Sequence, residues 1–199
     1  MSGFFAQAQL ATFPKAELTI VSASGPHRFT VELATTPDQM EQGLMFRQSL
    51  AADAGMLFDY RAPAMAAMWM KNTLIPLDML FVDQQGRIIN IHERAVPGSL
   101  DPIAAAAPAR AVIELNGGTA ARLGIRPGDQ VLFEELRRWR SKQAKAASVP
   151  AFVIFDDKTL TEVAARRPTD RAGLLAVPGI GPVKLERYGD DLLAVVAGH

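Results

Sequence analysis

Lysine, amide and carboxylate side chains lie close together in the apolar stretch Trp69–Phe81. Lys71, Asn72 and Thr73 can form a polar turn at the rim of a pocket, with Asp78 as a counter-charge for Lys71 or for Arg47. These residue types at the rim of a pocket could bind a small anion or an amide. The alternative is structural: Asn72 and Asp78 satisfy backbone groups of a loop, and Lys71 is solvated.

The same candidate pocket includes Trp69 and His92. The pair His92 and Glu93 follows a predicted strand and could form a metal site with Asp78, because imidazole and carboxylate groups bind divalent metals. A single histidine beside an acid is more often a hydrogen-bonded structural residue. We therefore expect no metal and no cofactor.

Methionines are concentrated in the first part of the chain. Met65, Met68 and Met70 are closely spaced, and Met45 and Met56 precede them. Thioether sulfur prefers soft metals, so a copper(I) site is one interpretation. Methionine also fills irregular cores, and we expect these residues to be core residues.

The segment 133–147 has the periodicity of an amphipathic helix. Its apolar side is formed by Phe133, Leu136, Trp139 and Ala147. Its basic side is formed by Arg137, Arg138, Lys142 and Lys145. Glu134 and Glu135 share the basic side and can pair with nearby arginines, so a solvated helix face is the alternative to a nucleic-acid contact.

A glycine-rich turn in Val177–Gly189 is the second basic feature. Gly179 and Gly181 allow a tight turn before a new helix. A helix start has outward amide groups and a dipole that favours phosphate, and Lys184 and Arg187 follow it. The turn therefore predicts a contact with a nucleic-acid backbone. The alternative is that the glycines only connect two packed helices.

Composition excludes several classes of protein. Lys plus Arg and Asp plus Glu each number 21, so no net charge argues for nucleic acid or a membrane as partner. The absence of cysteine excludes disulfides, thiolate nucleophiles and cysteine-based zinc sites. No apolar run reaches the roughly 18 residues of a membrane span. We expect a cytoplasmic protein as the chain is written, or a periplasmic, exported one if Phe4–Ala8 is the remaining end of an export signal that has been removed.

Short strands predominate before residue 132, and helices predominate after it. Strands are expected within 16–33 and at 55–58, 68–70, 77–82, 87–91, 111–115 and near 131. Short helices are expected at 36–45 and 119–123, and longer or paired helices at 133–147, 156–167, 169–175, from 182, and at 192–197, the last capped by Asp190. This order predicts an α+β chain: a β-rich domain, with a curled sheet or partial barrel, followed by a small all-α bundle.

The expected domain boundaries leave almost no linker. A flexible N-terminus covers 1–15, the β-rich domain covers 16–132, and the helical domain covers 133–199. A junction without a linker predicts that the two domains hold a restricted relative orientation.

The β-rich part resembles a known bacterial family. The motifs are Gly43–Arg47, Gly55–Phe58, Trp69–Phe81 and Gly124–Asp129. They look like the family called domain of unknown function 192, and the similarity covers essentially residues 16–132. The resemblance implies a β-rich single domain, often exported when it stands alone, and it implies no established reaction.

The helical part resembles the HRDC domain, the helicase-and-RNase-D C-terminal module. The resemblance is carried, in order, by Leu136–Arg140, Val149–Phe155, Thr159, Leu160, Pro168, Leu175–Lys184, Tyr188 and Gly189. It implies a five-helix bundle that assists nucleic-acid binding by RecQ-type helicases and RNase D, as an auxiliary module and not a catalyst. No Walker motif or exonuclease carboxylate set precedes it in this chain.

These features predict a non-enzymatic, two-domain protein whose bundle contacts the backbone of single-stranded or duplex nucleic acid. The alternative is an exported or cytoplasmic protein, a small-ligand or metal binder or a cryptic hydrolase, that acts through Lys71, Asn72 and Asp78. In that case the bundle docks a protein partner. The two resemblances ordinarily indicate different compartments, so an unusual or artificial gene fusion is a further possibility.

Overall fold

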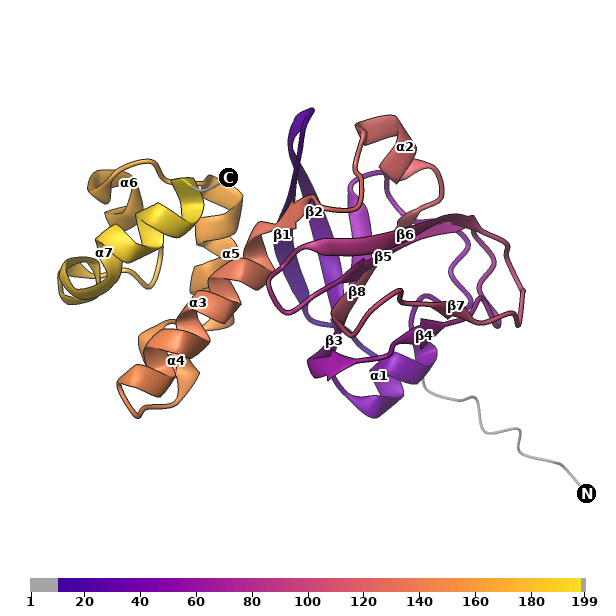
Figure 1. The fold of residues 1–199 in the computed structure, drawn as a ribbon, viewed down its shortest axis with the longest axis horizontal. Coiled ribbons are helices and arrows are strands. Elements are labelled where there is room, and N and C mark those ends of the chain that lie inside the picture. Colours follow the sequence, from indigo (N-terminus) through magenta and orange to yellow (C-terminus); the bar gives the residue numbers. More distant parts are fainter. Residues whose placement is uncertain (1–10, 198–199) are drawn as a thin grey trace, which may run out of the picture.

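The computed structural model describes residues 11–197, apart from the side chains of Phe133, Glu134, Glu135 and Ala165. A sheet domain occupies one side of the molecule and a helical bundle the other (Figure 1). The described strands are β1 (Lys15–Ser22), β2 (Gly25–Ala34), β3 (Ala54–Ala64), β4 (Ala67–Met68), β5 (Leu77–Val82), β6 (Ile88–Ala95), β7 (Ile103–Ala104), β8 (Ala109–Asn116) and β9 (Gln130–Val131). The described helices are α1 (Pro37–Gln42), α2 (Thr119–Leu123), α3 (Leu132–Ala146), α4 (Ala151–Ile154), α5 (Asp157–Arg166), α6 (Arg171–Leu175) and α7 (Pro182–Ala197).

Seven strands form one curled sheet in the order β6-β5-β8-β3-β2-β1-β9, and β4 and β7 form a separate two-stranded sheet. All pairings in the large sheet are antiparallel except that of β2 with β3. The two ends of the sheet approach each other, since the Val131 amide donates to the Gly86 carbonyl at 2.7 Å and the Ile88 amide donates to Asp129 at 2.8 Å. The predicted β-rich domain with a curled sheet, followed by a five-helix bundle, is confirmed.

Local capping signals account for several helix starts. The Thr36 side chain accepts from the Gln39 amide, as expected for an N-cap. Asp156 and Asp170 cap α5 and α6 in the same way, each at 2.7 Å. The predicted break at Asp190 is wrong, because α7 runs without interruption from Pro182 to Ala197.

Several other sequence expectations differ in their bounds; for example, the strand expected at 55–58 extends to Ala64 and the helix expected at 36–45 ends at Gln42. The expected strand at 68–70 is shorter and earlier, since β4 covers only Ala67–Met68. The helix expected from residue 133 already begins at Leu132. The predicted placement of the Phe133 ring beside Trp139, and the predicted pairing of Glu134 and Glu135 with arginines, fall on side chains outside those described.

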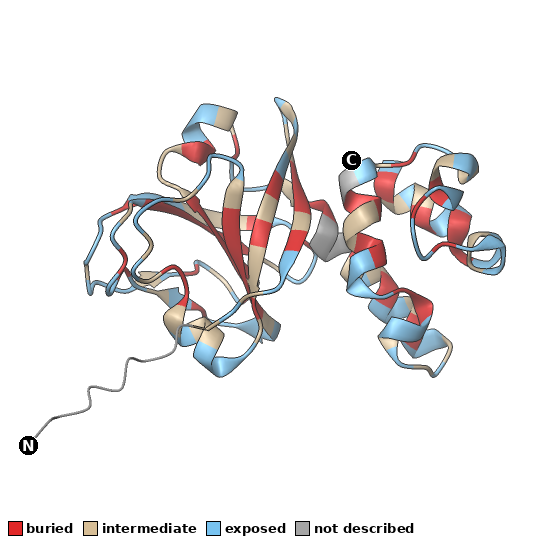
Figure 2. Ribbon diagram, turned by 180° about the vertical axis from the view of Figure 1, so that it is seen from behind, coloured by how far each residue is buried: buried red, intermediate tan, exposed pale blue. Residues whose placement is uncertain are grey.

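Each face of the sheet has its own hydrophobic core. One core contains Leu57, Leu80 and Ile113, and it continues into the bundle through Leu132 and Leu136. The other core contains the remaining apolar side chains of the same strands, among them Met56, Met79 and Phe81. All six residues of β5 are buried because both faces are covered (Figure 2).

The bundle packs directly on β1. Leu18 and Ile20 of β1 belong to the same buried cluster as Leu160 and Val163 of α5. The Thr19 hydroxyl donates to the Ala164 carbonyl at 3.1 Å in this buried contact. Since β9 ends at Val131 and α3 begins at the next residue, shared apolar packing and not a linker joins the two parts.

The three longest helices of the bundle, α3, α5 and α7, are amphipathic, and α3 contacts both of the others. Across residues 11–197, no helix has the length and apolar character needed to cross a lipid bilayer.

Candidate functional site

A basic groove lies where the helical bundle meets the sheet domain. It encloses about 490 Å³ and is lined by Arg61, Gln84, Arg110, Arg137, Arg138, Arg140, Ser141, Lys142 and Lys145. Seven of these nine residues are basic, and no acidic residue of the described chain is among them. Helix α3 supplies the side chains from Arg137 onward, while β3 and β8 supply Arg61 and Arg110. The groove is therefore built by both parts of the chain.

A buried carboxylate beneath the groove holds two of its guanidinium groups. Asp59 is only 4% exposed and pairs with Arg110 from β8 and, at 2.6 Å, with Arg137 from α3. Asp59 also accepts from the Arg61 amide at 2.8 Å, which fixes the backbone where Arg61 has a positive φ of 61°. One carboxylate thus organises basic residues from three elements, and it joins the sheet to the bundle.

The predicted basic residues of α3 therefore divide into two kinds. Arg138, Lys142 and Lys145 are exposed at the groove. Arg137 is tied to Asp59, a role that its place on the expected solvent face did not predict. Arg140, on the same helix, is buried and donates to the Phe155 carbonyl at 2.9 Å.

The predicted residues of the glycine-rich turn lie elsewhere in the bundle. Lys184 is placed over the Phe155 ring at 5.0 Å, and Arg187 lies over the Tyr188 ring at 5.2 Å. These rings pack with Trp139 in an aromatic cluster. None of the turn residues lines the basic groove, so the two predicted contact sets do not form one site.

The turn itself depends on one glycine more than on the other. Gly179 has a φ of +92°, and a Cβ there would stand 2.2 Å from the Thr159 hydroxyl, whereas a Cβ at Gly181 would meet nothing within 4 Å. We expect Gly179→Ala to lower the free energy of unfolding by about 2 kcal/mol or more, because positive φ and steric overlap add. Gly181→Ala is the matched control and should change it by less than about 1 kcal/mol. Urea unfolding of both variants measures the difference, and equal stabilities would contradict this account.

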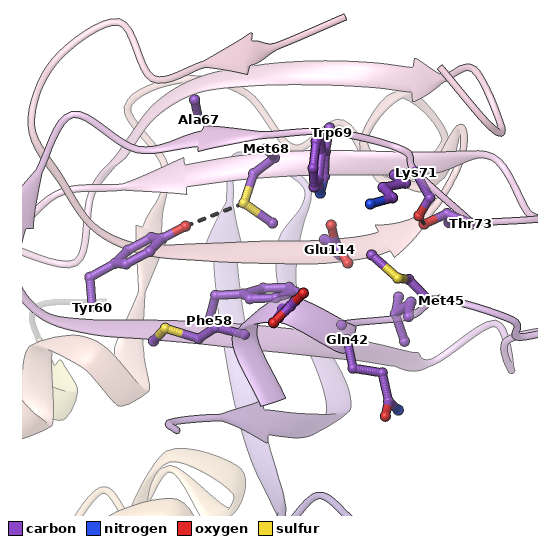
Figure 3. A pocket seen from close by; sticks show the side chains of 14 residues that line it. Gln42, Met45, Phe58, Tyr60, Ala67, Met68, Trp69, Lys71, Thr73 and Glu114 are labelled. Atoms are coloured by element: carbon purple, nitrogen blue, oxygen red, sulfur yellow. Dashed lines mark hydrogen bonds between the residues drawn. The ribbon is translucent and has the colours of Figure 1, made fainter. Parts of the chain in front are cut away.

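The candidate pocket of the sheet domain is a cavity of about 290 Å³, and its lining side chains are drawn in Figure 3. Two of the predicted pocket residues, Trp69 and Lys71, line it. The Lys71 ammonium lies 5.1 Å from the centre of the Trp69 ring. Further lining side chains include Met45, Phe58, Tyr60, Met68, Thr73 and Glu114.

The other predicted pocket residues have different places. Asp78 is fully buried, and its carboxylate accepts the amides of Arg94, Gly118 and Ala120, each at 2.8 Å. It is therefore not a counter-charge for Lys71 or for Arg47. Its role is the structural alternative, satisfying backbone groups where β6 bulges and α2 begins.

Arg47 and Asn72 lie outside the lining of this cavity. Arg47 pairs with Glu32 at 2.5 Å. Asn72 has a positive φ of 55°, and its carbonyl accepts from the Phe46 amide at 2.9 Å. The Asn72 side-chain amide donates to the Met45 sulfur at 3.8 Å, so its predicted role of satisfying backbone groups is not confirmed, although its positive φ suits a loop position.

The metal interpretations gain no support from the geometry. His92 is exposed on β6 and lines a different pocket of about 360 Å³. Among the residues that the structure describes, no three His, Asp or Glu side chains gather as a metal site. Met56 and Met70 are core residues as predicted, Met45 and Met68 line the cavity, and Met65 is 66% exposed, contrary to its predicted core position.

The residue that sequence reasoning missed is Glu114. It lies in the middle of β8, paired with Met56 on one side and Met79 on the other, and it is 4% exposed. Burial raises the pKa of Glu114 to about 8. Burial, together with the nearby Glu114 carboxyl, also raises the pKa of Tyr60. The sequence signal for Glu114 is a single acid inside the apolar strand Ala111–Leu115. Acidic side chains are rarely buried, because burying an unpaired carboxylate is costly, so such a position indicates a specific role.

Comparison with known proteins agrees with this two-part architecture. The family DUF192, described as an uncharacterized ACR, matches residues 19–133. The chain belongs to the DUF192 family. A solved structure of a protein of unknown function from Novosphingobium aromaticivorans DSM 12444 is 43% identical, covers 65% of this chain and 99% of that one, and has a TM-score of 0.58. The DUF192 fold thus accounts for the whole sheet domain.

The rest of the chain matches a second family. The HRDC domain matches residues 129–196. The ATP-dependent DNA helicase UvrD2 of Mycobacterium tuberculosis H37Rv is 50% identical over 71 residues, which are 36% of this chain and 10% of the helicase. The ATP-dependent DNA helicase RecQ of Haemophilus influenzae is 32% identical over 99 residues, which are 50% of this chain and 16% of the helicase. Both predicted resemblances are confirmed, and this chain spans only a small part of the helicases that it matches.

Proposed function

We propose that this protein binds the phosphate backbone of nucleic acid in the basic groove, with the HRDC domain and the DUF192 domain each supplying part of the surface. The observation that carries the proposal is the lining of that groove, in which seven of nine residues are basic. Backbone phosphates are the anions that such a surface of Arg and Lys side chains recognises, independently of base sequence.

Accessible cations stand on both sides of the groove. Arg138 and Lys142 lie one helical turn apart on α3 and are exposed, and Lys145 continues the same surface. Arg61 is exposed on the DUF192 side. A phosphate chain that enters the groove can therefore be contacted from two elements at once.

The buried arginines prepare this surface. Asp59 fixes the guanidinium groups of Arg110 and Arg137 below the exposed cations. Arg140 is fixed by the Phe155 carbonyl and, at 2.7 Å, by Asp157. Side chains already held in place lose less conformational entropy when a ligand binds. The helicases with related HRDC segments act on DNA, as their names state, and this relationship supports a nucleic acid as the ligand.

Binding should weaken steeply with salt. If three to four phosphates are contacted, the logarithm of the association constant should fall with the logarithm of salt concentration with a slope of about −3 to −4 on duplex DNA. Arg138→Gln, Lys142→Gln and Arg61→Gln should each reduce that slope by about 1. Fluorescence anisotropy with labelled duplex and single-stranded oligonucleotides across a salt series measures these slopes.

The matched control is Arg122→Gln, an exposed arginine of α2 outside the groove. This variant should bind as the wild type does. Absence of binding at low salt, or groove variants that behave like the control, would refute the proposal. Loss of affinity in Lys184→Gln alone would place the contact at the turn before α7 instead.

A further inference from the structure

We infer that the DUF192 cavity lined by Glu114 is a binding site for a small organic cation, an ammonium or guanidinium group on a short apolar body, with the Glu114 carboxylate as its counter-charge. This site is separate from the basic groove and does not depend on nucleic-acid binding.

The first step is the unpartnered carboxyl. The Glu114 side chain is only 4% exposed, and it lines the cavity. Within the described part of the chain, no hydrogen bond or ion pair involves its side chain. A buried acid without a partner destabilises the fold, whereas Asp59 and Asp78 in the same domain each have several partners. A ligand that supplies the missing positive charge would remove this penalty.

The second step is the character of the walls. Phe58, Tyr60 and Trp69 line the cavity around Glu114, and Figure 3 shows Trp69 on one side of the carboxyl and Phe58 on the other. The Tyr60 hydroxyl donates to the Met68 sulfur at 3.3 Å, which holds the ring in place. Aromatic faces attract cations, and methionine side chains pack against apolar groups, so the walls suit a cation with an apolar body.

The third step is the rim. The Lys71 ammonium lies over the Trp69 ring, so a cation already occupies an aromatic face at this cavity. Trp69 is 48% exposed and Lys71 is exposed, so both can move aside when a ligand enters. A ring that holds the ammonium of the protein itself can hold that of a ligand in the same way.

The fourth step is the effect of protons. Burial raises the pKa of Glu114 to about 8, so near neutral pH the empty site holds mostly the neutral acid. Three other ionisable side chains line the cavity: the exposed Glu41 of α1, Tyr60 of β3, and Lys71. Only the ionised Glu114 carboxylate can pair with a cation at the buried end of the site, and binding there should therefore release a proton. Affinity should rise about tenfold per pH unit below pH 8 and level off above it, as expected when the carboxyl must ionise before the cation binds.

The experiment is isothermal titration calorimetry of the full chain with n-butylammonium, n-butanol and butyrate at several pH values. We expect n-butylammonium to bind, with proton release and the stated pH dependence, and the neutral and anionic analogues not to bind. Glu114→Gln should abolish binding, and Trp69→Ala should weaken it by about fivefold, the loss of one cation–π contact. Glu93→Gln, an exposed acid of β6, is the control and should bind as the wild type does.

Carbon-13 NMR of the Glu114 carboxyl in the wild-type protein provides a readout that needs no variant. Its titration midpoint should fall when n-butylammonium is added. Equal binding of the three analogues, unchanged binding by Glu114→Gln, or a midpoint that does not move would each overturn the inference. Because the groove residues are untouched in these experiments, their failure is distinguishable from failure of nucleic-acid binding.

Discussion

Replacing Asp59 by alanine is expected to lower the free energy of unfolding by about 3–5 kcal/mol. The carboxylate is buried and pairs with Arg110 and Arg137. Its removal therefore leaves two largely buried guanidinium groups without the counter-charge that they share. The same change removes the acceptor of the Arg61 amide. Urea unfolding at neutral pH measures the loss.

Two variants sharpen this prediction. Asp59→Asn keeps the shape and the acceptor but not the charge, and it should also destabilise the protein strongly. Asp53→Asn is the control: it changes an exposed carboxylate directly before β3, and it should change the free energy of unfolding by less than about 0.5 kcal/mol. A small effect of Asp59→Ala would mean that the ion pairs between the sheet and the bundle do not hold the two domains together.

Replacing Glu114 by glutamine is expected to make the protein more stable than the wild type at pH 8, and nearly equal to it at pH 5. Burial raises the folded-state pKa of Glu114 to about 8 from its ordinary value of 4.5. The stability that goes with a protonated Glu114 is fully present below pH 4.5, and it is lost as pH rises through the folded-state pKa. Between these values the wild type should lose about 1.4 kcal/mol per pH unit relative to the variant.

Urea unfolding of the wild type and of Glu114→Gln, at intervals from pH 5 to pH 8.5, measures this difference. Comparing the two proteins at each pH cancels the contribution of other titrating groups. Glu93→Gln should run parallel to the wild type across the range, because Glu93 is exposed. If Glu114→Gln also runs parallel to the wild type, then Glu114 has an ordinary pKa and the cavity is wetter than its burial indicates.

The two candidate sites share one strand. Successive side chains of a strand point to opposite faces of the sheet. In β3, Phe58 and Tyr60 line the cavity, while Asp59 and Arg61 serve the basic groove. The groove and the cavity therefore lie on opposite faces of the DUF192 sheet, and a substitution in β3 can be aimed at one without removing a side chain of the other.

Joining the two domains has a physical consequence for the HRDC helix α3. In its sequence, Arg137 belongs to a basic face that could be solvated. In the structure, the DUF192 domain binds it through Asp59 and adds Arg61 and Arg110 beside it. The two domains together thus form a basic surface that is larger than the part supplied by either domain alone.

Much of the fold was determined by local sequence. Thr36, Asp156 and Asp170 mark helix starts because their side chains accept from amides that the helix leaves unpaired. Alternating apolar residues and Gly or Pro turns determined most strands, and long motifs determined both families. The predicted cap at Asp190 is wrong because an aspartate inside a helix cannot be distinguished by sequence alone from one at a helix start. In the structure, Tyr188, Leu192 and Val196 belong to one buried cluster, and the helix continues through Asp190.

The sites were decided by tertiary structure. Sequence placed Trp69 and Lys71 at a pocket, but Asp78 of the same stretch points into the backbone turns and not into the cavity. Glu114 enters the cavity from β8, which is adjacent to β3 and β5 only after the sheet has formed. The basic groove needs Arg61 and Arg138, which are far apart in sequence, to line one surface at the junction. Local sequence sets caps, turns and periodicity, since these depend on near neighbours. The partner of each charged side chain depends on long-range packing, and that is why Asp59 and Glu114, one paired and one unpaired, could be told apart only in the folded protein.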